Sequence, residues 1–286
     1  MIKLLLNKKI EVKKHFEVNK HFEIKKKEYK IININLIINH PHGIFSIFSL
    51  ALMSMMEHSL YNNNIMSFKI TDTFNIFDLI TQKNNCIYTN YTPKNIYNDF
   101  LNITNIKSKN FLLGKNILKK IKLSDELMNL VNLNISKYNI NNKTLGIHIR
   151  LTDMNINHHS ILSINTYIDK IRKIIKENQI SNIFLASDND ESIDIIIKHF
   201  ANENLSINYI PNLIRSLKQE TSQDFTIQQY NYLYNTDQEI KKNFITDSFL
   251  DMLCLSKCGY LIHRTSNVAN FAILYSDSIE HIYKLD

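Results

Sequence analysis

Hydrophobic and polar positions alternate regularly along the second half of the chain. Short apolar stretches rich in β-branched residues, such as LGIHI at 145–149 and NIFLAS at 182–187, predict buried strands. The segment 164–178 places apolar residues three or four positions apart, which predicts a helix with one buried side. That side consists of Ile164, Tyr167, Ile168, Ile171, Ile174 and Ile175.

Strand-like and helix-like segments follow one another in strict order up to the end of the chain. The predicted series is strand 145–149, helix 164–178, strand 182–187, helix 191–203, strand 207–210, helix 248–258, strand 260–263, helix 266–276 and strand 279–285. Such alternation predicts an α/β protein whose parallel sheet is covered by helices on both faces, in a doubly wound fold.

The first half carries a shorter version of the same pattern. A strand at 31–38 stops at NHPHG, an apolar helix follows over 44–61, and IMSFKITDT at 65–73 reads as the next strand, which makes a βαβ unit. The stretch 75–120 is less regular, with short helices expected at 75–80 and 95–103.

Two Rossmann-like halves are expected, with residues 1–140 and 141–286 as their boundaries. The segment 124–138, with Ser124 as N-cap and apolar positions at helical spacing, predicts an amphipathic helix that leads into the second half. Ligands of such a fold bind in the cleft that faces the carboxyl ends of the strands.

Composition narrows the class of protein. The chain has 286 residues, of which 44% are hydrophobic, enough for a large core. It contains no apolar run of the roughly 18 residues that a membrane span requires, and its first residues reach charges too soon for a secretory signal. A cytoplasmic protein is the expectation. Cys86, Cys254 and Cys258 do not suggest a disulfide framework, and the last two are expected as small buried hydrophobes.

A formal net charge of +7 raises the question of a nucleic-acid partner. The lysines alternate with apolar residues and glutamates, as in solvated helix faces, and they lack the interleaved aromatic residues on which bases stack. An anionic ligand such as a nucleotide accounts for the positive charge equally well. No nucleic-acid partner is therefore expected.

Polar side chains gather where three of the predicted strands end. The first strand of the second half leads to Arg150 and Asp153, the strand 182–187 leads to Asp188–Asp190, and the strand 260–263 leads to the segment Arg264, Thr265, Ser266 and Asn267. Carboxyl ends of parallel strands share one edge of the sheet, so these groups are expected to face one cleft.

The use of arginine points to an anion at that cleft. Only four of the 34 basic residues are Arg, and Arg150 is one of them. Thr265 or Ser266 is placed to cap the following helix, whose free N–H groups and dipole attract an anion, and a guanidinium adds two parallel hydrogen bonds. Together they suggest a diphosphate. The alternative is an ordinary cap at Ser266 and a structural ion pair between Arg150 and Asp153.

The histidines and acidic residues near the same edge leave further alternatives open. His148 alternates with Ile147 and Ile149, so it points to the opposite face of the sheet, either as a core residue or as part of the site. His158 and His159 follow Arg150 in a loop, as candidate general bases or as solvated side chains. Asp188 and Asp190 have the spacing of a metal-binding Asp-x-Asp pair, although two acids in a polar loop are common.

Three stretches together resemble the fucosyltransferase superfamily with the two-Rossmann (GT-B) fold, which includes the α1,6-, α1,2- and protein O-fucosyltransferases. GIHIRLTDM (146–154) is similar to the family's His-x-Arg-Arg-x-Asp segment, and IFLASDNDESI (183–193) to its strand and acidic turn. DSFLDMLCLSKCGYLIHRTSNVANFA (247–272) resembles its closing segment, and HPHGIFSIFSLALMSM (40–55) its N-terminal glycine loop and helix.

The resemblance implies an inverting, metal-independent transferase that moves fucose from GDP-fucose to a glycan acceptor, an oligosaccharide or glycolipid, with no cofactor. By this likeness Arg150 binds the β-phosphate, Asp251 lines the donor site, with Asp247 one turn before it as a weaker candidate, and Ser266 with Asn267 contacts the diphosphate. His148, Asp188, Arg264 and Thr265 are expected beside the donor. His42 and Gly43 are expected on the acceptor side of the cleft.

Two departures from the family pattern separate the hypotheses. Leu151 stands where many members carry a second Arg, and the loop after Asp153 has no Glu where the α1,6 branch carries an acid. Asp153, His158 and His159 therefore stay as candidate catalytic bases. The alternatives are a GT-B transferase with another nucleotide sugar, and a protein that binds a sugar nucleotide or glycan without catalysis.

Overall fold

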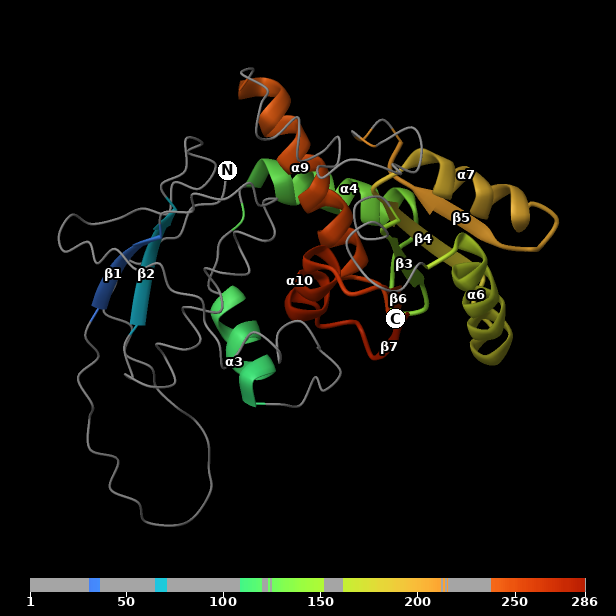
Figure 1. The fold of residues 1–286 in the computed structure, drawn as a ribbon, viewed down its shortest axis with the longest axis horizontal. Helices are drawn as coiled ribbons and strands as arrows, with labels where there is room; N and C mark the ends of the chain where they lie inside the picture. Colours follow the sequence, from blue (N-terminus) through green and yellow to red (C-terminus); the bar gives the residue numbers. More distant parts are fainter. Residues whose placement is uncertain are drawn as a thin grey trace, which may run out of the picture.

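The computed structural model describes residues 31–36, 65–70, 109–119, 123, 125–151, 162–211, 213, 215 and 238–285. Its main body is a parallel sheet with helices on both faces (Figure 1). The predicted α/β class is confirmed. None of the helices within these residues is long and apolar enough to span a membrane.

Five strands of the second half form one sheet. They are β3 (Leu145–Ile149), β4 (Asn182–Ser187), β5 (Ser206–Tyr209), β6 (Tyr260–His263) and β7 (His281–Lys284). Their order is β5-β4-β3-β6-β7, and every neighbouring pair is parallel. Within this sheet the chain first forms the central strand β3 and continues outward through β4 to β5. It then returns to the other side of β3 and adds β6 and β7. The winding therefore reverses between β3 and β6, and this is the place where doubly wound sheets bind ligands.

Helices α6 (Ile164–Asn178) and α7 (Asp190–His199) cover one face of this sheet (Figure 1). The side of α6 predicted to be buried is confirmed, with Ile164 and Ile175 packed at its margin. Alternate residues of β3, Leu145, Ile147 and Ile149, point into this core and are fully buried. Helix α7 ends at His199 rather than 203, where Phe200 turns into the core.

The opposite face is covered by α9 (Gln238–Leu255) and α10 (Asn267–Tyr275), and α4 (Asp125–Lys137) packs against α9 (Figure 1). Gly146 of β3 lies against α9 and the turn after it: a Cβ there would sit 3.1 Å from Leu255 Cδ2 and 3.0 Å from Cys258 Sγ. His148 shares this face, as its alternation with Ile147 and Ile149 predicts. Cys254 and Cys258 are free thiols buried there, also as predicted.

Helix α9 begins ten residues before the predicted helix at 248–258. The added residues 238–247 are mostly polar and lack the apolar periodicity used to find the helix, but they contain no Gly or Pro to interrupt it. The hydrophobic pattern of the sequence therefore placed the start of α9 too late.

Two strands of the first half pair with each other. β1 (Ile31–Leu36) and β2 (Ile65–Ile70) run parallel in a separate sheet, with Ile31 opposite Ile65. Both strands were predicted, and parallel pairing requires a crossover connection of the kind expected for a βαβ unit. The predicted helix 44–61, and His42 and Gly43 before it, lie outside the described residues. The helices predicted at 75–80 and 95–103 and Cys86 lie outside them too.

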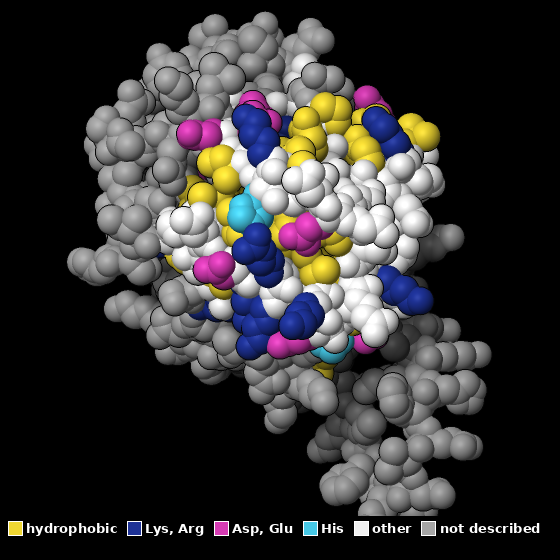
Figure 2. Space-filling model, turned by 90° about the vertical axis from the view of Figure 1, so that its right-hand side faces the viewer, with side chains coloured by type: hydrophobic (Ala, Val, Ile, Leu, Met, Phe, Trp, Pro, Cys, Tyr) yellow, Lys and Arg dark blue, Asp and Glu magenta, His cyan; other side chains and the backbone are white. Residues whose placement is uncertain are grey.

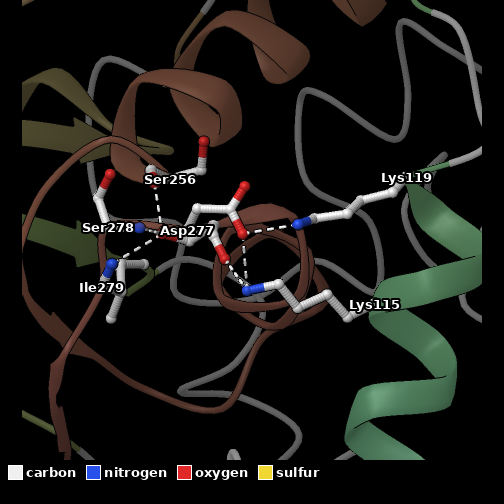
Figure 3. Close-up of polar contacts among 7 residues, drawn as sticks. Lys115, Lys119, Ser256, Asp277, Ser278 and Ile279 are labelled. Carbon is white, nitrogen blue, oxygen red and sulfur yellow. Dashed lines mark hydrogen bonds and ion pairs between the residues drawn. The ribbon is translucent and has the colours of Figure 1, made fainter. Parts of the chain in front are cut away.

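Helix α3 (Lys109–Leu118), which was not predicted, contacts the second half of the chain (Figure 3). Lys115 Nζ donates to the Ser276 carbonyl, and Lys115 and Lys119 form ion pairs with Asp277 at 3.0 and 2.7 Å. These hydrogen bonds lower the pKa of Asp277. The lysine-rich run around 115–120 is therefore partly engaged with the carboxyl end of α10, where a cation is favoured. The division into domains 1–140 and 141–286 stays a prediction.

Candidate functional site

The site is built at the carboxyl ends of β3 and β6, where the winding of the sheet reverses. His148, the penultimate residue of β3, lies on the face covered by α10, and the half-buried Arg150 follows the last residue, Ile149. β6 ends with His263, followed by Arg264, whose exposed fraction is 2%. His148 lies opposite His263 in the strand register, so two imidazoles and two guanidinium groups come from adjacent strands.

Ser266 closes this cluster from the side of α10. It is the N-cap of the helix, and its Oγ accepts a hydrogen bond from Ala269 N–H at 3.1 Å. The same Oγ lies 3.2 Å from His148 Nδ1. Ser266 is therefore the predicted cap, but it also joins the helix to the central strand. Thr265 before it and Asn267, the first residue of the helix, are both half-buried.

The charged and buried groups of this cluster act on His148. Burial, together with the charges of Arg150 and His263, lowers the pKa of His148 from 6.5 to about 3. His148 is therefore neutral at pH 7. His263 Nδ1 donates to the Arg264 carbonyl at 3.0 Å, which fixes the orientation of its ring. Positive charge near His148 therefore acts at the carboxyl ends of β3 and β6, and such a charge favours an anionic ligand.

The turn after β4 brings the first carboxylate to the same edge. Asp188 is buried, and its Oδ1 accepts a hydrogen bond from Leu151 N–H at 3.4 Å. Asn189 is the N-cap of α7, with its Oδ1 accepting from Ser192 N–H at 2.9 Å. No group of three potential metal ligands occurs within the described part of the chain. The segment 188–190 serves as a helix start that also supports the loop after β3.

Arg215, to which the sequence analysis gave no role, lies at this edge of the sheet beside the ends of β4 and β5. Arg215 has a side chain only 2% exposed. Its Nε donates to the Ser187 carbonyl at 3.0 Å, its Nη1 to the Ile210 carbonyl at 3.0 Å, and its Nη2 to Asp251 Oδ2 at 3.5 Å. The guanidinium therefore joins the ends of β4 and β5 to α9. The sequence contained one indication of this role: Arg is rare in a Lys-rich chain, so its use indicates a need for several donors in a planar fork, which Lys cannot supply.

Asp251 is the partner that this arginine holds. Its side chain is 13% exposed, and Oδ1 is buried without a hydrogen-bond partner among the described residues. Burial and the charge of Asp247 raise the pKa of Asp251 to about 7, against the opposing effect of Arg215. A carboxyl with a pKa shifted toward neutrality by burial is typical of a functional site.

The structure brings part of the predicted site together. His148 and Ser266 are in contact, and Arg150, Arg264, Thr265 and Asn267 belong to the same strand ends. Asp188 and Asp251 lie along the same edge, bridged through Arg215 and the end of β4. Asp153, His158 and His159, and with them the predicted ion pair of Arg150 and Asp153, lie outside the described residues.

Leu151 occupies a different environment from the half-buried Arg150 before it. Its side chain is 2% exposed and packs in the apolar core between the sheet and α6 and α7. Its N–H, by contrast, is directed to Asp188. The position that carries a second Arg in the resembled family therefore contributes its backbone, and not its side chain, to the edge of the sheet.

Comparison with solved structures identifies the fold. A crystal structure of NodZ α-1,6-fucosyltransferase with GDP matches at 13% sequence identity and a TM-score of 0.53, covering 91% of this chain and 96% of that one. Fucosyltransferase NodZ from Bradyrhizobium also gives 13% and 0.53, over 91% and 97%. NodZ soaked with GDP-fucose gives 13% and 0.50, over 87% and 93%.

No protein-family model and no curated protein sequence matches the chain. The likeness is therefore one of structure: the chain has the GT-B fucosyltransferase-like fold predicted from its motifs. At 13% identity this likeness extends to the fold and not to the activity.

Proposed function

We propose that the chain is a glycosyltransferase that moves fucose from GDP-fucose to a glycan acceptor, with inversion at the sugar. The observation that carries the proposal is the set of positive groups at the reversal point of the sheet. Arg150 follows β3 and Arg264 follows β6 at this point. Helix α10 begins beside them, after its N-cap Ser266, which contacts His148. This arrangement suits a diphosphate with a negatively charged leaving oxygen.

The proposed chemistry divides between two groups of residues. Negative charge grows on the β-phosphate as the glycosidic bond breaks, and Arg150, Arg264 and the N–H groups of α10 stabilise it. The neutral His148 adds a hydrogen-bonding group to this cluster without adding to its charge. A base then takes the acceptor proton, with Asp153, His158 and His159 as candidates.

Metal independence is part of the proposal because the chain itself supplies the positive charge that a divalent ion brings in other transferases. Buried guanidinium groups and a helix end perform the same electrostatic task without a change of coordination. The donor therefore enters as a substrate, and no cofactor is required. Nucleotide sugar and oligosaccharide or glycolipid acceptor are the proposed partners, with the cytoplasm as the proposed compartment.

The surface offers modest support for a small anionic ligand over a nucleic acid. Lys and Arg side chains are interspersed with Asp and Glu on the face seen in Figure 2, rather than collected in a band of one sign. Backbone recognition of a nucleic acid depends on such a band.

Thermal unfolding in the presence of nucleotides tests the donor site. GDP and GDP-fucose are expected to raise the Tm of the wild type, because a ligand of the native state stabilises it. Arg150→Ala is expected to lose most of this increase while unfolding at a similar temperature without ligand. Arg172→Ala is the matched control, since Arg172 lies on the exposed side of α6. No Tm increase with millimolar GDP in the wild type would contradict the proposal.

Two further measurements separate the alternatives. An equal or larger shift with UDP or its sugars would favour a GT-B transferase with another donor. Release of GDP from GDP-fucose in the presence of a panel of glycans distinguishes an enzyme from a protein that only binds. The binding protein is the second candidate because an apolar, buried Leu151 stands where many members of the resembled family carry a second Arg.

A further inference from the structure

Arg215 has no role in the chemistry described above, although it binds Asp251, a residue that the family resemblance places in the donor site. The Arg215 side chain lies at the same edge of the sheet, because it binds the carbonyl of Ser187, the last residue of β4, and that of Ile210, which follows β5. A guanidinium that is 2% exposed is costly to bury unless its hydrogen bonds are made. Three of its nitrogens have acceptors here, which fixes the group in one position.

The two carboxylate oxygens of Asp251 differ in their hydrogen bonding. Oδ2 faces Arg215 Nη2 at 3.5 Å, whereas Oδ1 is buried with no hydrogen-bond partner within the described structure. Buried polar atoms are nearly always hydrogen-bonded in native proteins, so an orphan acceptor on a fixed carboxylate indicates that a donor is missing. The 13% of the side-chain surface that stays exposed belongs to atoms other than Oδ1, and a ligand group that approaches from that side is the candidate for the missing donor.

We propose that Arg215 is a positioning residue of the donor site: by binding Oδ2 it orients the Asp251 carboxylate so that Oδ1 accepts an N–H or O–H group of the bound nucleotide sugar. The inference rests on the proposed function, since the ligand is the donor proposed there. Arg215 itself does not touch the ligand. Its effect passes through Asp251 and through the turn after β4, where it binds the carbonyl that precedes Asp188.

The charges around Asp251 support this role. Asp247 and Cys254 lie on α9 beside it, Arg215 faces it from the segment after β5, and burial acts on it most strongly. Of these influences only Arg215 favours the ionised form. Without the guanidinium, Asp251 would carry a proton at neutral pH. That proton would interfere with the hydrogen bond that Oδ1 accepts from the ligand.

Carbon-13 titration of the aspartate carboxyls, without any nucleotide, measures the first half of the proposal. Arg215→Gln removes the charge and is expected to raise the pKa of Asp251 above its wild-type value. Arg215→Lys keeps the charge and is expected to restore much of that value, as a conservative rescue. An Asp251 titration that Arg215→Gln leaves unchanged would overturn the proposal, whether or not GDP binds.

Calorimetry with GDP and GDP-fucose at pH 7.5 measures the second half. Arg215→Gln and Asp251→Asn are each expected to weaken binding roughly tenfold or more, the effect of a lost hydrogen bond to a charged group. The double variant is expected to bind no more weakly than Asp251→Asn, because both changes remove one interaction. Additive losses, or wild-type affinity in Arg215→Gln, would refute it. If Arg215→Gln fails to fold, Asp251→Asn in the wild-type background still tests the ligand contact, because unchanged affinity for GDP in that variant would refute it.

The two halves separate this inference from the proposed function. A wild type that binds no GDP would refute the proposed function, and the donor role of Arg215 with it, while the titration would still decide whether Arg215 controls Asp251. A wild type that binds GDP, with variants of Arg215 that do so equally well, would refute only the inference. Arg172→Gln, on the exposed side of α6, is the control for loss of a positive charge.

Discussion

The two edges of the five-stranded sheet are built from different kinds of polar group. At the amino ends of the strands, neutral amides and a hydroxyl bind one another: Asn182 Nδ2 donates to the Asn139 carbonyl at 2.9 Å and lies 3.1 Å from Thr144 Oγ1. Asn182 Oδ1 in turn accepts from Asn208 at 2.8 Å. At the carboxyl ends, buried charged groups gather, and Asp251 keeps an oxygen without a partner within the described residues.

The difference shows what each edge is for. A network of satisfied neutral groups holds loops together at little electrostatic cost. Buried histidine, arginine and carboxylate side chains destabilise the fold unless a ligand or a precise partner offsets their desolvation. Stability is therefore expected to reside at the amino edge and ligand binding at the carboxyl edge, and three experiments test that division.

Gly259→Ala, at the amino edge, is expected to have the largest effect. A Cβ at this position would lie 1.9 Å from the carbonyl oxygen of Asn142, so the backbone before β3 or β6 must move. We expect a loss of about 4 kcal/mol or more in the free energy of unfolding, or no folded protein. Gly146→Ala is the control, because its Cβ would meet the side chains of Leu255 and Cys258, which can shift. Equal denaturation midpoints for the two variants would contradict this expectation.

Paired substitutions at the carboxyl edge are expected to change the pH dependence of stability in opposite directions. The pKa of His148 is lowered from 6.5 to about 3, so its contribution to stability is lost as the pH falls from 6.5. The pKa of Asp251 is raised from 3.8 to about 7, so its contribution is gained as the pH falls from 7. Between pH 8 and 5 each amounts to about 2 kcal/mol.

Urea unfolding at pH 8 and pH 5 measures these two contributions. On acidification, His148→Asn is expected to gain stability relative to the wild type, because the unfolded state no longer takes up that proton. Asp251→Asn is expected to lose stability relative to the wild type. Differences of the same sign, or differences that do not vary with pH, would show that burial does not govern these groups.

Asn182→Ala is expected to have the smallest effect, and to separate stability from binding. The change removes the donors to Asn139 and Thr144 and the acceptor of Asn208 at a partly exposed site, for a loss of about 1 kcal/mol. Affinity for GDP is expected to stay at the wild-type value. Asn134→Ala is the control, since Asn134 bonds only to the Leu130 carbonyl on the exposed side of α4. Weaker GDP binding in Asn182→Ala would argue against separate tasks for the two edges.

Much of the fold followed from local pattern. The strands of both halves, the buried side of α6 and the cap at Ser266 all depend on residues within a few positions of one another, so a sequence reader has access to them. The motifs also pointed to the GT-B fold, which the comparison with NodZ confirms. Helix α3 was missed because the lysines in and just after it were read as solvated, whereas Lys115 and Lys119 bind Asp277, far along the chain.

The sequence by itself determined the order of the elements, the cap of α10 and the strand ends at which polar groups accumulate, because periodicity and capping act over a few residues. Only the tertiary structure decided that His148 meets Ser266, that Leu151 turns into the core, and that Arg215 binds Asp251. Those contacts join elements brought together by the winding of the sheet. They depend on strand order and on what each face buries, which no short stretch of the chain contains.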